Sequence, residues 1–496
     1  MARRIEYEPS RTLTEFRLLP GLTTPETSVE TVSLDTSLAR NGDGIVPLKA
    51  PVVAAAMQSV SGVRMGVELA KLGGAAFVFC SQTAEEQAAM VARIKSHKAG
   101  FVEPRTVNPS TKLREVETLR RDAGYSTFPV VGRDGRLLGL ITRRDYDARI
   151  HADLPASERM IPRDQLDVGV GITDLAEANA LLIEGHRAVL PIVDGDDRLL
   201  YLVFRKDIED HLDNPDMVSD ARKRLLSVAA INTHDASDRL PALVEAGVDV
   251  VSIDSSDGYS TYQRDTIEWI RGRYEDLPVI GGNVITGAGF EYLAASGAGA
   301  VKVGMGGGSI CITQEQKGTG RGLATAIIDV VAERDRYAQE TGQYVPIIAD
   351  GGIVTSKDVI VALALGADVV MMGRYFARMD ESPTEKIQIN GRIMKPYWGE
   401  GSARAREWSP ARYRHAAFVE GVEGFVEYAG KLRDNLPPLL SKLRAAMASC
   451  GCRTLAELRE NAELEIASAL SIREGKVHDI VQFGGGERDS LSSWST

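Results

Sequence analysis

The chain has 496 residues, about twice the length of one α/β barrel, so it holds either a barrel with large insertions or several domains. Hydrophobic residues at 44% and charged residues at 26% are typical of a globular protein and exclude a collagen-like or largely disordered chain. The 58 basic and 69 acidic residues leave a formal charge of −11, which excludes a net basic field for nucleic acid or an anionic membrane.

The sequence has no apolar run of the ~18–20 residues that span a bilayer, and its start, MARRIEYEPSRTLTEF, lacks the apolar core of a signal peptide. We therefore expect a cytoplasmic protein with no membrane or nucleic-acid partner. The four cysteines are too few for a disulfide framework and lack paired CxxC spacing, so we expect reduced thiols at Cys80, Cys311, Cys450 and Cys452. Scattered histidines without an HExxH pattern give no indication of a transition-metal site.

Eight short apolar runs predict strands, and they are too apolar to alternate, as expected of parallel strands buried on both faces. They cover residues 51–57, 74–79, 225–232, 249–254, 278–283, 300–304, 346–352 and 368–374. The segments between them place apolar residues at helical spacing and often end in glycine, which is typical of crossover helices. Eight strand-helix units favour a closed (β/α)₈ TIM barrel, with a doubly wound sheet as the alternative.

Residues 103–214 interrupt the alternation of strands and helices and contain a repeat of their own. GYSTFPVVGRDGRLLGLITRRDYD begins at Gly124 and GHRAVLPIVDGDDRLLYLVFRKDIE at Gly185, an offset of 61–62 residues. The pattern predicts two copies of a β-hairpin followed by a helix start. It resembles a tandem pair of CBS modules (a Bateman domain), which implies a regulatory site for a purine nucleotide; a structural spacer is the alternative.

The two copies differ at the position where the CBS pattern places a ribose-binding hydroxyl. Thr142 and Asp145 match that pattern in the first copy, whereas Phe204 stands ahead of Asp207 in the second. At least one of the implied nucleotide sites therefore departs from the family pattern. The predicted organisation is a discontinuous barrel, 1–102 and 215–496, that carries this module.

The stretch KVGMGGGSICITQEQKGTGRG, residues 302–322, follows the sixth predicted strand. Three glycines, Gly306 to Gly308, let the backbone approach a ligand, and Cys311 adds a nucleophilic thiol. Barrel enzymes keep their active sites at this end of the strands. A buried cysteine in a glycine-rich turn is the alternative reading.

Polar residues follow several other predicted strands, so they would meet at the same end of the barrel. This convergence is stronger evidence for an active site than any single motif. Glycines after strands seven and eight suit a phosphate, to which Arg374 would add a charge, and Asp350 suits a ribose diol. The remaining strand-end groups are Asp254, Ser255, Ser256, Asn283 and Lys302, with Tyr262 placed to stack on a base.

Together these residues resemble the inosine 5′-monophosphate (IMP) dehydrogenase family over essentially the whole chain. The shared motifs are AAAMQSVSG, IDSSDG, GGNVITG, GMGGGSICIT, ADGGI, YWGEGS, the Arg412-Tyr413 pair and the EGK-x-H segment near the C-terminus. The GSICxT segment followed by DGG is highly specific and is shared with close relatives such as guanosine monophosphate (GMP) reductase.

The resemblance implies NAD-dependent oxidation of IMP to xanthosine 5′-monophosphate in guanine nucleotide biosynthesis. Cys311 would form a covalent thioimidate at C2 of the purine while hydride passes to NAD⁺. A flap of about residues 386–418 would then close, and water would hydrolyse the adduct. The family assigns water activation to Arg412 and Tyr413, with Thr313 relaying to Glu420 as a second route.

The resemblance also implies the binding residues and a homotetramer. The residues implied for IMP are Ser309, Asp350, Gly352, Gly373, Arg374, Tyr397, Gly399, Glu400 and Glu420. Those implied for NAD are Asp254, Asn283, Gly304 and Thr313, with His234 and Tyr262 beside the adenine. A potassium ion would bind carbonyls of Gly306, Gly308 and Cys311, with Glu474, Gly475 and Lys476 supplied by a neighbouring subunit.

The sequence departs from the usual family pattern at Arg374, Glu400 and Lys476, and only six residues separate Tyr413 from Glu420, which predicts a short flap. GMP reductase is the nearest alternative function, although it generally lacks the Arg-Tyr pair. A non-catalytic nucleotide sensor is the alternative from another class, and retention of Cys311, Thr313 and Arg412 together argues against it.

Overall fold

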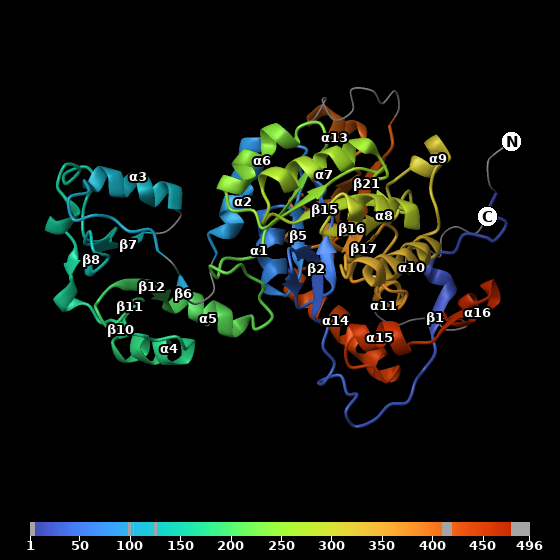
Figure 1. Cartoon of the computed structure of the whole chain (residues 1–496), viewed down its shortest axis with the longest axis horizontal. Coiled ribbons are helices and arrows are strands. Elements are labelled where there is room, and N and C mark those ends of the chain that lie inside the picture. Colours follow the sequence, from blue (N-terminus) through green and yellow to red (C-terminus); the bar gives the residue numbers. More distant parts are fainter. Residues whose placement is uncertain (1–4, 98–100, 103, 124–125, 409–418, 478–496) are drawn as a thin grey trace.

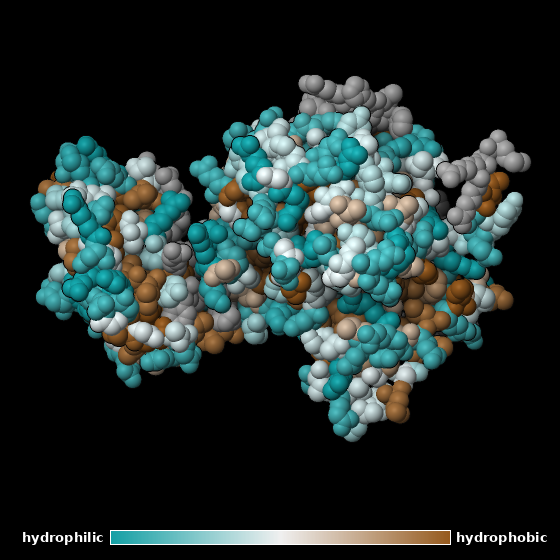
Figure 2. Space-filling model, viewed as in Figure 1, coloured by the Kyte–Doolittle hydropathy of each residue, from teal (hydrophilic) through white to brown (hydrophobic). Residues whose placement is uncertain are grey.

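The computed structural model describes residues 5–97, 101–102, 104–123, 126–408 and 419–477. Its ribbon forms a large lobe that contains the barrel and a smaller lobe built from residues of the predicted insert (Figure 1). The space-filling view shows the two lobes joined by a narrow neck (Figure 2).

All eight predicted strands lie in one closed parallel barrel, which confirms the predicted fold class. Its order is β13-β14-β15-β16-β17-β18-β4-β5. The strands are β4 (Val52–Ala54), β5 (Ala75–Val78), β13 (Val228–Ile231), β14 (Val250–Ile253), β15 (Val279–Val284), β16 (Ala300–Val303), β17 (Ile347–Asp350) and β18 (Val369–Met372). Nearly every residue of these strands is buried, because side chains fill the barrel on one face and helices cover the other.

The crossover helices lie outside the barrel where the helical spacing predicted them. They are α1 (Val63–Lys71), α2 (Ala84–Lys95), α6 (Ala236–Glu245), α7 (Thr261–Arg273), α8 (Gly287–Ala295), α10 (Leu323–Thr341) and α11 (Ser356–Ala364). The predicted glycine cap is clear after α10, where Gly342 has φ +72° and its N–H bonds to the carbonyl of Ala338. A hairpin of β2 (Thr36–Asn41) and β3 (Gly44–Leu48) lies at the opposite end of the barrel from the strands' carboxyl ends, and Arg40 N–H bonds there to Gly299.

The smaller lobe repeats one hairpin at a constant offset of 62 residues. β7 (Thr127–Val131) and β8 (Leu137–Thr142) correspond to β11 (Val189–Val193) and β12 (Leu199–Phe204), each pair with a register shift at the same place. The hairpins also bond to each other symmetrically, Leu137 N–H to the Asp197 carbonyl and Leu199 N–H to the Gly135 carbonyl. These bonds join the two copies into one pseudosymmetric unit with two small cores.

Two details of the insert differ from the sequence prediction. The predicted helix start follows only the second copy, as α5 (Arg205–Asp213); after the first copy the chain makes turns instead. There the Asp145 carboxylate accepts a bond from Thr142 N–H at 2.6 Å, a local side-chain bond that competes with helix formation. In addition, β6 (Phe101–Val102), which the prediction assigned to the barrel segment, pairs with β12 of the insert.

The remaining elements follow the last barrel strand. β19 (Ile387–Ile389), β20 (Arg392–Trp398) and β21 (Glu423–Glu427) form a sheet, and α13 (Ala403–Trp408) follows β20. The C-terminal part contains α14 (Leu432–Ser449), α15 (Leu455–Asn461), β22 (Leu464–Ile466), which pairs with β1 (Phe16–Leu18), and α16 (Ala469–Glu474). Of the helices in the described ranges, none is long and apolar enough to cross a membrane.

Candidate active site

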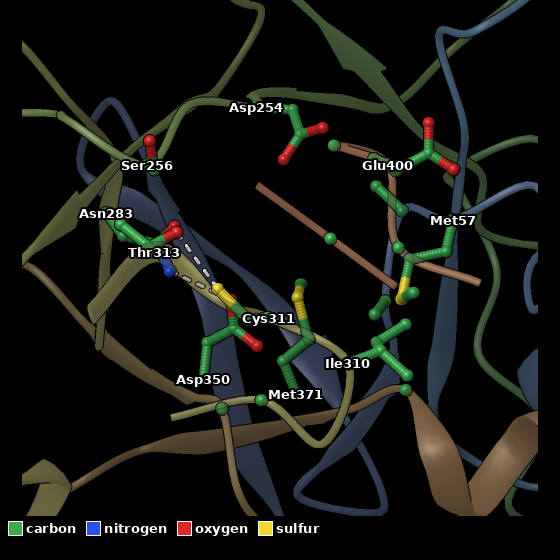
Figure 3. A pocket seen from close by; sticks show the side chains of 18 of the residues that line it. Met57, Asp254, Ser256, Asn283, Ile310, Cys311, Thr313, Asp350, Met371 and Glu400 are labelled. Atoms are coloured by element: carbon green, nitrogen blue, oxygen red, sulfur yellow. Dashed lines mark hydrogen bonds between the residues drawn. The ribbon is translucent and has the colours of Figure 1, made fainter. Parts of the chain in front are cut away.

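A cavity of about 380 Å³ opens at the carboxyl ends of the barrel strands, where barrel enzymes place their active sites. It contains most of the residues singled out from the sequence, and Figure 3 shows several of their side chains around one space. The predicted residues that line it are His234, Asp254, Asn283, Gly308, Ser309, Cys311, Thr313, Asp350, Gly352, Gly373, Arg374, Tyr397, Gly399, Glu400 and Glu420.

Cys311 lies on the loop between β16 and α9 (Thr313–Lys317), at one wall of the cavity. Its Sγ is 3.1 Å from Thr313 Oγ1, and that hydroxyl donates to Glu420 Oε2 at 3.3 Å. The backbone holds the three residues together, because Ile312 N–H bonds to the Glu420 carbonyl at 3.1 Å. The arrangement puts a thiol, a hydroxyl and a carboxylate in one hydrogen-bonded row. Figure 3 shows its first part, the contact between Cys311 and Thr313.

A second group of polar and charged side chains lies at the ends of β14 to β17. Asn283 donates through Nδ2 to Asp350 Oδ2 at 2.8 Å and to the Gly304 carbonyl at 2.9 Å. Lys302 is almost fully buried, and its Nζ is 3.7 Å from Asp254 Oδ1. Burial raises the pKa of Asp350, while the Lys302 charge and the Asn283 bond oppose that rise. Partly buried carboxylates with hydrogen-bond capacity suit the hydroxyls of a ribose.

Close packing in the loop after β18, where the sequence suggested a phosphate site, leaves no room for a side chain at Gly373. A Cβ at Gly373 would lie 2.8 Å from the Tyr397 hydroxyl and 3.1 Å from Met57 Sδ, so a side chain there would displace the tyrosine. Arg374 is the first residue of α12 (Arg374–Ala377) and lines the cavity. Burial raises the pKa of the Tyr397 phenol, which stays protonated and can donate a hydrogen bond.

Glu400 lines the cavity, but its carboxylate also bonds to the barrel. Gln58 N–H donates to Oε1 at 2.7 Å, and the Ser81 hydroxyl donates to Oε2. Gln58 in turn accepts a bond from Trp398 Nε1 at 3.0 Å. The segment after β20 is therefore fastened to the loops after β4 and β5.

Several predicted site residues lie outside the cavity wall. Gly304 supports Asp350 from behind, since a Cβ there would lie 1.9 Å from the Asp350 carbonyl. Tyr262 is 69% exposed at the rim, with its ring 6.5 Å from that of His234. Arg412 and Tyr413 lie outside the described residues.

The residues predicted for a cation lie in two places. Gly306 and Gly308 are on the cysteine loop, where the Gly308 carbonyl accepts a bond from Cys311 N–H at 3.1 Å. Glu474, Gly475 and Lys476 lie at the end of α16, and α16 packs on the segment Leu13–Glu15 of the same chain. In the described part of the chain, no group of three or more His, Cys, Asp or Glu side chains is placed to hold a metal ion.

Other residues also line the cavity, although the sequence motifs did not predict them as site residues. They are Ala55, Ala56, Asn232, Thr233, Ile310, Ile353, Val354, Met371, Gly401 and Gly421. Asn232 follows β13 directly, so the strand-end rule used for the other strands would have found it. Gly421 forms a bridge with Cys311 from a segment 110 residues away, and no local signal predicts that contact.

The closed barrel and this row of thiol, hydroxyl and carboxylate at the carboxyl ends of its strands are typical of a barrel enzyme. A family model described as "IMP dehydrogenase / GMP reductase domain" matches residues 10–478. The chain belongs to the IMP dehydrogenase/GMP reductase family.

Individual relatives cover nearly the whole chain. Inosine-5′-monophosphate dehydrogenase of Tritrichomonas foetus is 46% identical over 488 residues, which are 96% of this chain and 97% of that protein. The protein of the same name from Escherichia coli (strain K12) is 37% identical and covers 91% of this chain and 92% of its own length. A crystal structure of a GMP reductase variant from Trypanosoma brucei with guanosine 5′-monophosphate has a TM-score of 0.79 and 31% identity, covering 96% of this chain and 98% of that one.

Proposed function

We propose that this protein oxidises IMP to xanthosine 5′-monophosphate with NAD⁺, through a covalent thioimidate on Cys311, in guanine nucleotide biosynthesis. The observation that carries the proposal is the row of Cys311, Thr313 and Glu420 on the wall of a cavity that also contains Asp350 and Arg374. The relatives named IMP dehydrogenase, 46% and 37% identical over nearly their full lengths, support the choice of substrate.

In the proposed reaction, Cys311 Sγ forms a bond to C2 of the purine, and C2 becomes an sp³ centre that can release its hydrogen as hydride. NAD⁺, when bound, is the hydride acceptor. Water then adds to C2, the C–S bond breaks, and the thiol is regenerated. The balance is IMP, NAD⁺ and water to xanthosine monophosphate, NADH and one proton.

The nucleotide and NAD are proposed to share the single cavity. Asp350, Arg374 and Tyr397 line the cavity together with Cys311 and would hold the ribose and phosphate of IMP. Asp254, Asn283 and His234 line the same cavity and would hold NAD. Carboxylate and amide groups fit the diol and amide of that cofactor, so the donor set is compatible with it.

Two routes are proposed for water activation. Thr313 and Glu420 are already hydrogen-bonded at 3.3 Å, so they form a ready relay. Arg412 and Tyr413 form the second route on the grounds of the family pattern. An arginine that acts as a base needs a strongly lowered pKa, since each unit costs about 1.4 kcal/mol.

Potassium and a tetramer belong to the same proposal. The carbonyls of the cysteine loop are suitable oxygen ligands, and a carbonyl that accepts one hydrogen bond, as that of Gly308 does, still has a second lone pair. Residues 474–476 would complete the site from a neighbouring subunit. We further propose that 103–214 is a CBS module in which Thr142 and Asp145 contact a regulatory purine nucleotide.

The test is a pair of assays on purified protein. With IMP, NAD⁺ and potassium we expect NADH to accumulate, measured by its absorbance. GMP reductase is the second candidate, favoured by the structural similarity to the Trypanosoma brucei enzyme. Consumption of NADPH with GMP, without NADH formation from IMP, would favour the reductase.

Arg412→Ala should keep the first burst of NADH and slow later turnovers, and loss of that burst would contradict the role given to Arg412.

A further inference from the structure

Gln263 is a buried glutamine that binds both backbone groups of one glycine near the end of a barrel strand. It lies in the first turn of α7 and is 0% exposed. Its Nε2 donates to the Gly282 carbonyl, and its Oε1 accepts a bond from Gly282 N–H at 2.9 Å. Gly282 belongs to β15 and directly precedes Asn283, which lines the cavity.

Gly282 lies where β15 extends past its neighbour β14. The pairing of these two strands ends at Ser252 with Ile280, and Gly282 is two residues further along β15. Buried backbone N–H and C=O groups need hydrogen-bond partners, because leaving them unpaired costs free energy. Gln263 supplies both partners and so takes the place of the strand that has ended.

The same stretch of β15 contains a bulge at Asn283. The pairing with β16 includes Gly282 and then Val284, so Asn283 is the extra residue between two paired positions. Bulges are common beside active sites, where they redirect a side chain. Gly282 has φ +122°, and a Cβ there would lie 2.6 Å from the Lys302 carbonyl oxygen, so the turn into the bulge requires glycine.

The Asn283 side chain uses its two amide hydrogens inside the protein. Nδ2 donates to Asp350 Oδ2 at 2.8 Å and to the Gly304 carbonyl at 2.9 Å. The remaining polar atom is Oδ1, a hydrogen-bond acceptor. Figure 3 shows Asn283 among the side chains of the cavity wall. NAD⁺ has suitable donors in its carboxamide N–H and its ribose hydroxyls.

The Asn283 backbone is held by the loop that leads into α7. Asn283 N–H bonds to the Ser255 carbonyl, and its own carbonyl accepts a bond from Gly258 N–H, both at 2.8 Å. Gln263 follows this loop in α7 and binds Gly282 directly. Loss of Gln263 would therefore loosen both the glycine before Asn283 and the loop that holds the Asn283 backbone.

We infer that Gln263 is a positioning residue that fixes Asn283 so that its Oδ1 can accept a hydrogen bond from NAD⁺. The inference rests on the proposed function, since it takes NAD⁺ as the ligand of Asn283. Gln263 is buried outside the cavity wall, so its effect on the cofactor passes through Asn283.

The experiment measures NAD⁺ binding by calorimetry in the full chain with Cys311→Ala, in the presence of IMP, so that no turnover occurs. Gln263→Met keeps the length of the side chain and removes its amide. It should weaken NAD⁺ binding by about tenfold, the effect of one hydrogen bond. In the Asn283→Ala background the same substitution should change the affinity by less than about twofold, because the group that Gln263 positions is already absent.

A conservative variant should restore binding. At pH 6, Gln263→Glu should bind NAD⁺ within about threefold of the parent protein, because burial favours the protonated acid, which has one donor and one acceptor like the amide. At pH 9 its carboxyl group should be ionised and unable to donate to the Gly282 carbonyl, so its affinity should fall relative to the parent protein.

Asn435→Leu is the matched control. Its Nδ2 also joins two backbone groups, the carbonyls of Ala429 at 2.9 Å and Lys431 at 2.8 Å, outside the cavity wall. The control substitution should lower the melting temperature and leave NAD⁺ affinity unchanged. A similar loss of affinity in Asn435→Leu would mean that general destabilisation, and not the position of Asn283, weakens binding, which would overturn the inference.

Two further results would also overturn it: an unchanged affinity in Gln263→Met, or an equal loss with and without the Asn283 side chain. If Gln263→Met does not fold, Gln263→Glu provides the test, and the same pH dependence as in the parent protein would contradict the inference. NADH formation from IMP is measured with Cys311 intact. Absence of both NADH formation and NAD⁺ binding would refute the proposed function and this inference together, whereas an active enzyme with unchanged affinity in Gln263→Met would refute the inference alone.

Discussion

The Asn283 side-chain amide donates to Asp350 Oδ2 over 2.8 Å and joins the carboxyl end of β15 to that of β17. The bond satisfies one oxygen of a buried carboxylate. Lys302, from the strand between them, adds a positive charge that lowers the pKa of Asp350 against the effect of burial. Burial outweighs these two groups, so the pKa of Asp350 lies above its usual value.

We expect the Asp350 carboxylate, which is proposed to bind the ligand, to lower the free energy of unfolding at neutral pH. Its pKa in the folded chain is raised above 3.8, so the folded state binds more protons than the unfolded state just above that pH. The free energy of unfolding then falls as pH rises from 3.8 through the folded-state pKa, and the loss persists at neutral pH. Asp350→Asn should therefore melt at a higher temperature than wild type at pH 7.5, with a smaller difference near pH 4.

The same variant should lose activity, by about tenfold or more, because an amide is a weaker partner for a ribose diol than a carboxylate. Asp35→Asn is the control for the melting experiment, as Asp35 is exposed and paired only at the surface. Equal melting temperatures of Asp350→Asn and wild type at pH 7.5 would show that the buried charge has no net cost.

Lys95 and Lys49 form lysine-aspartate pairs of similar length that differ in burial. Lys95 Nζ lies 2.6 Å from Asp249 Oδ2 and 2.8 Å from Asp220 Oδ2, with only 2% of its side chain exposed. The Lys49 pair with Asp35 is 2.7 Å long, and 45% of the Lys49 side chain is exposed. Lys95→Met should lower the free energy of unfolding by about 3 kcal/mol because it removes the ammonium that pairs with the Asp249 carboxylate, while Asp220 keeps its pair with Arg224.

Lys49→Met should cost no more than about 1 kcal/mol, as for other exposed pairs. Urea unfolding followed by tryptophan fluorescence measures both values. Asp220 follows the insert and Lys95 precedes it, so we also expect Lys95→Met to increase protease cleavage at the neck between the lobes. Similar losses of stability in the two variants would show that burial does not determine how much these ion pairs contribute to the free energy of unfolding.

Cys311→Ala should reduce NADH formation from IMP by about 10³-fold or more, because it removes the proposed nucleophile. Binding of IMP, followed by calorimetry, should remain measurable. Cys452→Ala is the matched control: its thiol is fully buried outside the cavity, so the change should lower stability and leave turnover per folded molecule unchanged. Turnover that survives in Cys311→Ala would remove the thiol from the mechanism.

The sequence predicted the barrel well because each of its strands is a local signal. A run such as PVVAAAM or PVIGG is apolar on both faces, which identifies a buried parallel strand without knowledge of its neighbours. The residues at strand ends, such as Asp254 and Asp350, then converge as a consequence of the closed topology. Contacts between distant segments have no such signal: the pairing of Cys311 with Gly421, and of Lys317 with Asp257, depends on how long loops fold back over the mouth.

Glu400 is expected to act mainly by fixing the segment after β20. Glu400→Leu would leave the Gln58 N–H without its 2.7 Å partner and the Ser81 hydroxyl unpaired, and should cost about 1–3 kcal/mol of unfolding free energy. Glu400→Gln keeps one acceptor and should lose less. A double-mutant cycle with Ser81→Ala measures the coupling between the two side chains. Additive losses would show that the Glu400–Ser81 bond contributes nothing to stability.

The insert is expected to be dispensable for the chemistry of the barrel. Its hydrophobic clusters, around Phe128 and around Leu190, are separate from the clusters of the barrel. The chain enters and leaves it at neighbouring points, since Leu225 N–H bonds to the His97 carbonyl at 3.1 Å. The structure also places β6 with the insert, so the deletion should remove residues 101–213 rather than begin at 103, with a short Gly-Ser linker in their place.

The shortened chain should melt cooperatively and form NADH from IMP within about threefold of the full chain, because no residue of the candidate site lies in the deleted range. Any effect of added purine nucleotides on the rate should disappear with the insert. A soluble, folded deletion protein without NADH formation, beside an active full chain, would mean that the insert contributes to the active conformation of the barrel. In that case the insert would be a part that the catalytic lobe requires, and not a separate regulatory module.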